Sequence, residues 1–424
     1  MLRAAERQSP PALAMKLPVL YAMRSSLYSA KARSYLVKQR IDYIERPPGD
    51  PRYGEQVVPE IGRWILPVLQ TDDGRLIQDT ADIFDYLDQL VPMERSANPP
   101  LGVQRVVSDL FALFGSEGLM RPAMHFRWNF DDLNMPFVAE DFGRGLFLPS
   151  GANEEVKSTF NFGPDLATDN QVEARAEVSN FAAQRMRKLT VELGVTPETI
   201  PEIERSYSEF LALFAAHLET APYLLGGRPT LGDFSLIGPL YAHLARDAAP
   251  AMIMRREAWP VWRWVERMNS PIADTGEYGD VPDELFADDS IPATLRALLE
   301  YVGAEFADDL IAHVQFIDQW LADNDEVEAG DVVGGKATRR SLGKTQWTWR
   351  GIPMETHVIP YRLLHLQRLQ ADFEALDSAD QAKVREIFAE AGIESFLELR
   401  ARRRVERDNN REVWGAAQDP VLPV

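Results

Sequence analysis

A proline inside an apolar strand segment is the feature that most constrains the fold of this chain. Residues 65–70 read Ile-Leu-Pro-Val-Leu-Gln, and after Thr71 and Asp72 comes the pair Asp73-Gly74, which is typical of a tight hairpin turn. Proline lacks the amide proton that a central strand needs, so it belongs at a strand edge or in a cis bend. Residues 80–90 then repeat apolar side chains with helical spacing. The segment therefore predicts a proline bend, a hairpin and a helix in succession.

The elements before this unit predict an α/β domain. Residues 17–22 form a short apolar run typical of a buried strand, residues 29–39 carry a helical pattern, and residues 41–45 alternate like a second strand. The expected order over residues 17–92 is strand, helix, strand, loop, strand, hairpin, strand, helix. We interpret residues 1–16 as a flexible tail.

Helical periodicity dominates the rest of the chain. We expect an all-helical domain over residues 100–275 and an additional α-helical extension over residues 285–424. Within the extension, residues 295–321 step mostly by three or four between apolar positions, which indicates one long amphipathic helix. The arginines of residues 400–407 are interpreted as the solvated face of a terminal helix that pairs with nearby glutamates.

Composition excludes several classes of function. The net charge of −20 repels phosphate backbones and anionic lipid surfaces, so we expect no nucleic-acid partner. The chain has no cysteine, which excludes disulfides, thiolate zinc sites and a cysteine nucleophile. Its six histidines show no metal-ligand spacing, so no metal is expected. No segment is long and apolar enough for a membrane span or a signal peptide, and a cytoplasmic location is expected.

Three segments of this chain resemble the glutathione transferase superfamily. Residues 17–36 are similar to its first strand, catalytic loop and first helix, and residues 65–90 to its proline–hairpin–helix unit. Residues 221–244 resemble its helical second domain, with Thr230 and Asp233 at capping-box spacing. By this resemblance the fold is a thioredoxin-like domain, an all-α glutathione-transferase domain and an α-helical extension. The chain is identified as an atypical, serine-type, bacterial-like member.

The resemblance implies that glutathione is the co-substrate and that a hydroxyl activates its thiol. Ser26 is the expected catalytic residue, with Leu27 where many members have proline, and Ser25 and Tyr28 are the alternatives. A free thiol has a pKa of ~8.5, and a hydrogen bond to its anion is worth ~1.5–3 kcal/mol. The alternative interpretation of Ser26 is a plain helix cap.

The resemblance also implies how the tripeptide is held. Leu66, which precedes the expected cis-proline Pro67, would pair its backbone with the cysteinyl unit. Thr80 would bind the γ-glutamyl carboxylate, and Asp79 the γ-glutamyl ammonium in place of the usual glutamate or glutamine. Arg63 is a candidate for the glycyl carboxylate. The alternatives are helix capping by Asp79 and Thr80 and a solvated loop position for Arg63.

A second substrate would lie against the helical domain. Met120, Met124, His125 and Trp128 are the candidate apolar wall, and core packing is the alternative. The sequence thus predicts a glutathione-transferase-like detoxification enzyme that acts on a small hydrophobic electrophile, with a homodimer expected from the resemblance. The alternative function is a non-catalytic binding or scaffold protein that keeps the fold.

Overall fold

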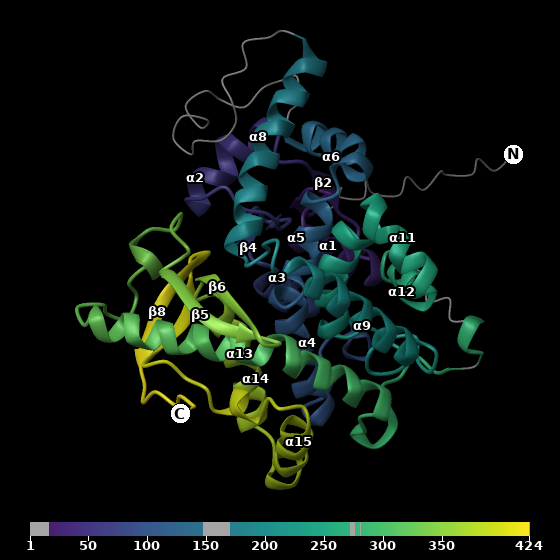
Figure 1. Cartoon of the computed structure of the whole chain (residues 1–424), viewed down its shortest axis with the longest axis vertical. Helices are drawn as coiled ribbons and strands as arrows, with labels where there is room; N and C mark the ends of the chain where they lie inside the picture. Colours follow the sequence, from purple (N-terminus) through teal and green to yellow (C-terminus); the bar gives the residue numbers. More distant parts are fainter. Residues whose placement is uncertain (1–16, 147–169, 272–275, 280, 424) are drawn as a thin grey trace, which may run out of the picture.

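The computed structural model of this protein describes residues 17–146, 170–271, 276–279 and 281–423, and the structural statements below refer to these residues (Figure 1). The tail expected at residues 1–16 lies outside them. The N-terminal part is a mixed four-stranded sheet in the order β2-β1-β3-β4, with β1 and β2 parallel and the other pairs antiparallel. Its elements are β1 (Val19–Tyr21), α1 (Leu27–Lys38), β2 (Ile44–Arg46), α2 (Val58–Ile61), β3 (Val68–Gln70), β4 (Leu76–Gln78) and α3 (Thr80–Asp88).

Alternation along β1 explains why this sheet is covered on both faces. Leu20 packs with residues of α1 and α3, including Leu36 and Phe84, in the main core. Its neighbour Tyr21 faces the opposite side, where it packs with Val58 and other residues around α2. Successive side chains of a strand point to opposite faces, so the four short strands can pack against helices on both faces of the sheet. The thioredoxin-like fold expected from the sequence is confirmed.

The middle of the chain is all-helical, as expected. It comprises α4 (Val103–Glu117), α5 (Met120–Trp128), α6 (Asp131–Leu146), α8 (Gln171–Glu192), α9 (Ile200–Leu218), α10 (Leu231–Pro239), α11 (Ala248–Glu257) and α12 (Trp259–Met268). Helix α10 is buried along its whole length and begins with the predicted capping box of Thr230 and Asp233. None of the described helices combines the length and apolarity of a membrane span.

Beyond residue 280 the expectation of a purely helical extension is wrong in part. The helices are α13 (Ala293–Asp323), α14 (Arg362–Glu374) and α15 (Ser378–Glu390), but two antiparallel hairpins accompany them. The hairpins are β5 (Gly343–Trp349) with β6 (Ile352–Val358), and β7 (Arg403–Asp408) with β8 (Arg411–Ala417). The arginine run that we assigned to a helix face therefore lies mainly on β7.

Local turn chemistry explains both hairpins. Arg350 and Gly351 join β5 to β6 with φ of 48° and 83°, and Asn409 and Asn410 join β7 to β8 with φ of 45° and 66°. Two consecutive residues with positive φ form the turn whose twist matches paired strands, and glycine and asparagine tolerate it best. The asparagine pair is the signal that the helical interpretation of residues 400–407 overlooked.

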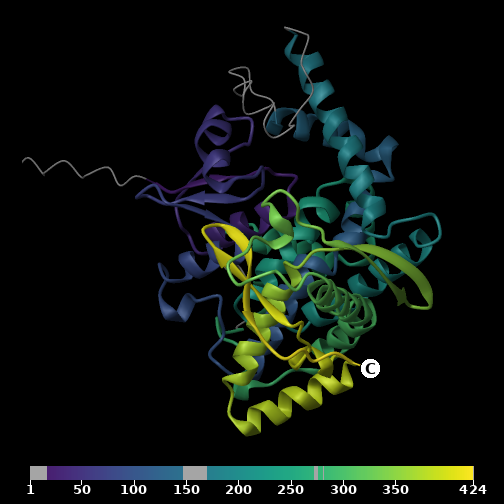
Figure 2. The same cartoon turned by 90° about the vertical axis from the view of Figure 1, so that its left-hand side faces the viewer.

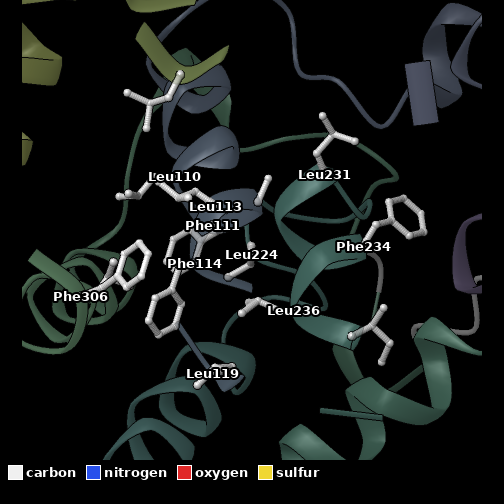
Figure 3. Packing of buried hydrophobic residues seen from close by; sticks show 14 of the residues in the cluster. Leu110, Phe111, Leu113, Phe114, Leu119, Leu224, Leu231, Phe234, Leu236 and Phe306 are labelled. Atoms are coloured by element: carbon white, nitrogen blue, oxygen red, sulfur yellow. The ribbon is translucent and has the colours of Figure 1, made fainter. Parts of the chain in front are cut away.

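The extension shares its hydrophobic core with the rest of the protein. One cluster of buried apolar side chains runs from Leu20 of β1 to Trp414 of β8. Phe306 of α13 meets Phe114 of α4 edge to face, with ring centroids 6.1 Å apart (Figure 3). Because such contacts replace water around large apolar side chains on both partners, the extension is bound to the helical domain as part of one core.

Gly303 allows α13 and α15 to approach closely, and its replacement by alanine is expected to destabilise the protein by about 1–3 kcal/mol. A Cβ at this position would lie 1.9 Å from the carbonyl oxygen of Ala391. Helix propensity alone predicts that Gly303→Ala stabilises the protein, since alanine is favoured over glycine in a helix by ~1 kcal/mol. The free energy of unfolding, measured by urea denaturation, distinguishes the packing effect from the propensity effect. The neighbouring exposed Ala304→Gly is the control, with a loss of ~1 kcal/mol from propensity; a more stable Gly303→Ala would contradict the packing argument.

Candidate functional site

The loop between β1 and α1 presents the hydroxyl of Ser26 at the start of the helix. Ser26 is half-buried, and its Oγ accepts a hydrogen bond from the backbone N–H of Ser29 at 3.2 Å. The structure therefore shows the capping role. A serine hydroxyl that accepts a bond still has its own proton to donate, so the capping role leaves Ser26 free to donate to a thiolate.

Ser25 is held in place by a buried ion pair. Its carbonyl accepts a hydrogen bond of 2.7 Å from Arg127 Nη1, and the Nε of the same guanidinium lies 2.6 Å from an Asp247 carboxylate oxygen. The Oγ of Ser25 is buried and has no hydrogen-bond partner among the described residues. A buried hydroxyl without a partner costs ~1–3 kcal/mol, so this atom is suited to receive a ligand group.

Tyr28, the other alternative donor, faces α4. Its hydroxyl lies 3.4 Å from the carbonyl oxygen of Ser116 and 3.4 Å from a carboxylate oxygen of Glu117. Burial, with Glu117 beside it, raises the pKa of this phenol. A higher pKa makes the hydroxyl a weaker acid, which disfavours Tyr28 as the group that stabilises a thiolate.

The peptide bond between Leu66 and Pro67 is cis, as the sequence predicts. Leu66 precedes β3, and its backbone N–H and C=O make no hydrogen bond within the described part of the chain. The next residue toward the N-terminus differs, because both backbone polar groups of Ile65 are bonded to the hydroxyl of Tyr53. The open backbone of Leu66 is therefore available for strand-like pairing with a peptide ligand.

Asp79 and Thr80 begin helix α3. Asp79 has φ of 93° and caps the helix, since its Oδ1 accepts the backbone N–H of Ala81 at 2.9 Å. Burial acts to raise the pKa of Asp79, but the charge of Arg407 and the bonds from Ala81 and Tyr361 lower this pKa to about 2. The Oγ1 of Thr80 is buried and has no partner among the described residues. The helix start thus offers a fixed carboxylate beside an unused hydroxyl.

Arg63 is buried, and its interpretation as a solvated loop residue is wrong. Only 3% of the residue is exposed. Its Nη1 lies 2.7 Å from one carboxylate oxygen of Glu412 and its Nη2 3.1 Å from the other, while Nη2 also bonds Gln78 at 2.6 Å. The cause is tertiary: the β7–β8 hairpin covers this arginine.

Three of the four residues predicted for the apolar wall lie together. Met120, Met124 and Trp128 are spaced four apart on one face of α5 and belong to a cluster with Met23 and Leu66. The cluster also includes residues of α6 and α8. It is the only hydrophobic cluster that joins the loop before Ser26, the residue before the cis-proline and α5 within the described residues.

His125 points elsewhere. Its Nε2 lies 3.0 Å from a carboxylate oxygen of Glu204, and its Nδ1 lies 2.8 Å from Nδ2 of Asn129. Burial lowers the pKa of His125. It follows Met124 by one residue and so sits about 100° around the helix from the methionine face. The structure does not bring His125 to the predicted wall.

Sequence reasoning missed four residues that the extension adds to the site. Figures 1 and 2 both show the β7–β8 hairpin beside the N-terminal sheet. In this hairpin Arg407 contacts both β4 and α3, Asn410 contacts β4, and Glu412 contacts Arg63. The fourth residue is Tyr361, which precedes α14 and donates a hydrogen bond to Asp79 at 2.9 Å. No local sequence pattern predicts a contact between residues separated by about three hundred positions.

Lys31 of α1 is a further buried charge next to this site. Its Nζ lies 2.7 Å from Ser116 Oγ. Burial lowers the pKa of Lys31 to about 8, although the negative charges of Asp79 and Glu117 act to raise this pKa. Helical periodicity gave no reason to single it out, because lysine at this position reads as a surface residue.

Two family models match parts of this chain. Residues 20–97 match the model of the glutathione S-transferase N-terminal domain, and residues 197–267 match that of the C-terminal domain. Comparison with curated protein sequences gives no match.

Among solved structures, the β-etherase LigF from Sphingobium sp. strain SYK-6 is similar at 17% identity and a TM-score of 0.41, covering 62% of this chain and 98% of its own. Gtt2 from Saccharomyces cerevisiae is similar at 16% identity and a TM-score of 0.33, and the match covers 61% of this chain and 99% of Gtt2. A GST-like protein from Pseudomonas syringae is similar at 15% identity and a TM-score of 0.37, and the match covers 81% of this chain and 97% of that protein.

The two domain matches lie in the family's order, on the thioredoxin-like domain with its cis-proline and on the helical domain with its capped central helix. Residues 20–97 and 197–267 of this chain therefore carry the N-terminal and C-terminal domains of the glutathione S-transferase family.

Proposed function

We propose that this protein binds glutathione and uses its thiol against a small hydrophobic electrophile. The observation that carries the proposal is the apolar cluster that joins Met23 and Leu66 to Met120, Met124 and Trp128. It lies beside the backbone that would hold the cysteinyl unit, so the thiol would face an apolar wall. Catalysis needs the two reactants at contact distance in a fixed orientation, and this arrangement favours it.

Each end of the tripeptide has a chemically suitable partner. The open backbone of Leu66 pairs with the cysteinyl unit, the unused hydroxyl of Thr80 at the start of α3 binds the γ-glutamyl carboxylate, and Asp79 pairs with the ammonium. The dipole at the start of a helix favours a carboxylate at that position. Arg63 remains the candidate for the glycyl carboxylate.

Ser26 then stabilises the thiolate. Its hydroxyl proton is not committed by the cap, and the start of α1 adds a favourable dipole. A hydrogen bond worth ~1.5–3 kcal/mol lowers the thiol pKa by about one to two units, which raises the ionised fraction at neutral pH roughly tenfold or more. Ser25, with its unpartnered Oγ, is the alternative donor.

Methionines suit a wall that must accept varied shapes. The cluster contains Met23, Met120, Met124, Met135 and Met186. Their unbranched side chains adapt to irregular apolar surfaces and are common where one surface binds several ligands. We therefore assign the second substrate to the class of small apolar electrophiles.

Glutathione titration by calorimetry tests the site. We expect Thr80→Ala to weaken binding about tenfold, since it removes a hydrogen bond to a charged group worth ~1.5–3 kcal/mol. Ser26→Ala is expected to leave the Kd nearly unchanged but to raise the pKa of the bound thiol, measured by thiolate absorbance, with Ser25→Ala beside it. The exposed Ser290→Ala is the control. Binding unaffected by Thr80→Ala would overturn the assignment of this residue.

A non-catalytic binding or scaffold protein is the second candidate. The observation that favours it is the ion pair of Arg63 with Glu412, which occupies a residue assigned to glutathione. No binding at millimolar glutathione, in the wild type and in variants that open the site, would decide for this alternative.

A further inference from the structure

The tip of the β7–β8 hairpin lies across the edge of the sheet that forms the candidate site. Asn410 Oδ1 accepts the backbone N–H of Gln78 at 2.8 Å, and Asn410 Nδ2 donates to the carbonyl of Leu76 at 3.2 Å. Arg407 bonds the carbonyl of Gln78 and pairs with Asp82 at 3.0 Å. Strand β4 is at the edge of its sheet, so these side chains occupy backbone groups that would otherwise face solvent.

Glu412 places a carboxylate on Arg63. The pair is bidentate, with distances of 2.7 and 3.1 Å, and the two side chains are 8% and 4% exposed. A guanidinium binds any carboxylate in this forked geometry with the same two bonds. The chain's own carboxylate therefore stands where we propose the glycyl carboxylate of glutathione binds.

Tyr361 likewise occupies Asp79, the residue that we propose for the γ-glutamyl end of glutathione. Its hydroxyl donates to Asp79 Oδ1 at 2.9 Å, and His365 Nε2 lies 3.1 Å from that hydroxyl. The guanidinium of Arg340 lies over the Tyr361 ring, 5.2 Å from its centroid. The group that we propose for the ammonium of glutathione is thus occupied by a neutral donor of this chain.

The hairpin is anchored at its base and held by polar contacts at its tip. Val405 and Trp414 are fully buried, and Trp414 stacks on Trp320 with centroids 5.9 Å apart. The contacts of Asn410 and Glu412 are hydrogen bonds and ion pairs. Polar contacts can be exchanged for equivalent bonds to a ligand at little net cost, whereas exposure of the apolar base cannot.

We propose that Glu412 and Tyr361 are internal competitors for glutathione, which hold Arg63 and Asp79 until the tripeptide displaces them. This inference rests on the proposed function and adds its regulation. Binding is then weakened by the fraction of molecules in which these two contacts are formed, and a change that opens them raises the affinity for glutathione.

Two variants and two ligands test the competition. In Glu412→Gln the amide cannot hold Arg63 as an ion pair, and we expect glutathione to bind about tenfold more tightly in calorimetry. γ-Glutamylcysteine, which lacks the glycyl carboxylate, should gain little from this variant. Tyr361→Phe keeps the ring under Arg340 but removes the hydroxyl that donates to Asp79, and should improve binding of both ligands. Glu406→Gln, on the exposed face of the same hairpin, is the matched control and should bind as the wild type does.

The outcomes separate this inference from the proposed function. If the wild type, Glu412→Gln and Tyr361→Phe all bind glutathione equally, the competition is wrong and the proposed function stands. If folded samples of all three fail to bind at millimolar concentration, the proposed function is wrong and the inference falls with it. Equal gains for both ligands in Glu412→Gln would overturn the pairing of Arg63 with the glycyl end.

Discussion

Replacement of Arg127 by methionine is expected to lower the free energy of unfolding by about 3–5 kcal/mol. The side chains of Arg127 and Asp247 are 1% and 0% exposed, and their closest atoms are 2.6 Å apart. Removal of the guanidinium leaves a buried carboxylate without its counter-ion and a Ser25 carbonyl without its donor. Burial already raises the pKa of Asp247 although Arg127 opposes it, which shows how unfavourable this position is for an isolated charge.

Chemical denaturation followed by circular dichroism measures this loss. Arg144→Met is the control: Arg144 is 67% exposed and pairs with Glu140 on the surface of α6, so a change below about 0.5 kcal/mol is expected. The double variant Arg127→Met with Asp247→Leu should recover much of the loss, because replacement of both charges removes the desolvation cost. A loss below 1 kcal/mol in the single variant would contradict the argument.

Asp309→Asn is expected to destabilise the protein by a similar amount, about 3–5 kcal/mol at neutral pH. Asp309 of α13 accepts from Arg121 of α5 at 3.1 Å and from Arg362 of α14 at 2.9 Å, with His313 also at 2.9 Å. An asparagine keeps the shape but removes the carboxylate that the buried guanidinium groups of Arg121 and Arg362 share, and Arg362 then retains Glu117 at 3.3 Å as its acidic partner. The variant therefore weakens the attachment of the extension to the helical domain.

The loss should depend on pH with a defined sign. Burial acts to raise the pKa of Asp309, but the charges of Arg362 and His313 and then Arg121 lower it below its ordinary value. A carboxyl whose pKa is lowered on folding stabilises the native state above its unfolded pKa of ~3.9, and that stabilisation declines as the pH falls further. The difference between wild type and variant should thus be constant near neutrality and shrink below about pH 4.

Denaturation curves from pH 3 to pH 7 measure this dependence, with the exposed neighbour Asp308→Asn as the control. The control is expected to change stability by less than about 0.5 kcal/mol at every pH. A difference for Asp309→Asn that grows on acidification would show that the carboxyl is not stabilised as its contacts indicate.

Local signals in the sequence determined the first two parts of this protein. The proline of residues 65–70 with its Asp-Gly turn predicts the cis bond at Pro67 and the hairpin that follows. The spacing of Thr230 and Asp233 predicts the start of α10. These features depend on neighbours within a few residues, since backbone geometry and capping are short-range, and so they can be read before any fold is known.

The tertiary structure alone decided what covers the candidate site. Glu412 reaches Arg63 across 349 positions and Tyr361 reaches Asp79 across 282. Neither contact has a local pattern, because it is set by how α13, α14 and the β7–β8 hairpin pack against the shared core. The sequence by itself thus predicted a glutathione-transferase fold and candidate binding residues. Only the folded chain revealed that a carboxylate and a hydroxyl of the same chain contact two of these candidates, Arg63 and Asp79. The physical reason is that hydrophobic burial fixes the position of the extension. This burial has no directional pattern in the sequence, and the position of the polar tip of the β7–β8 hairpin follows from it.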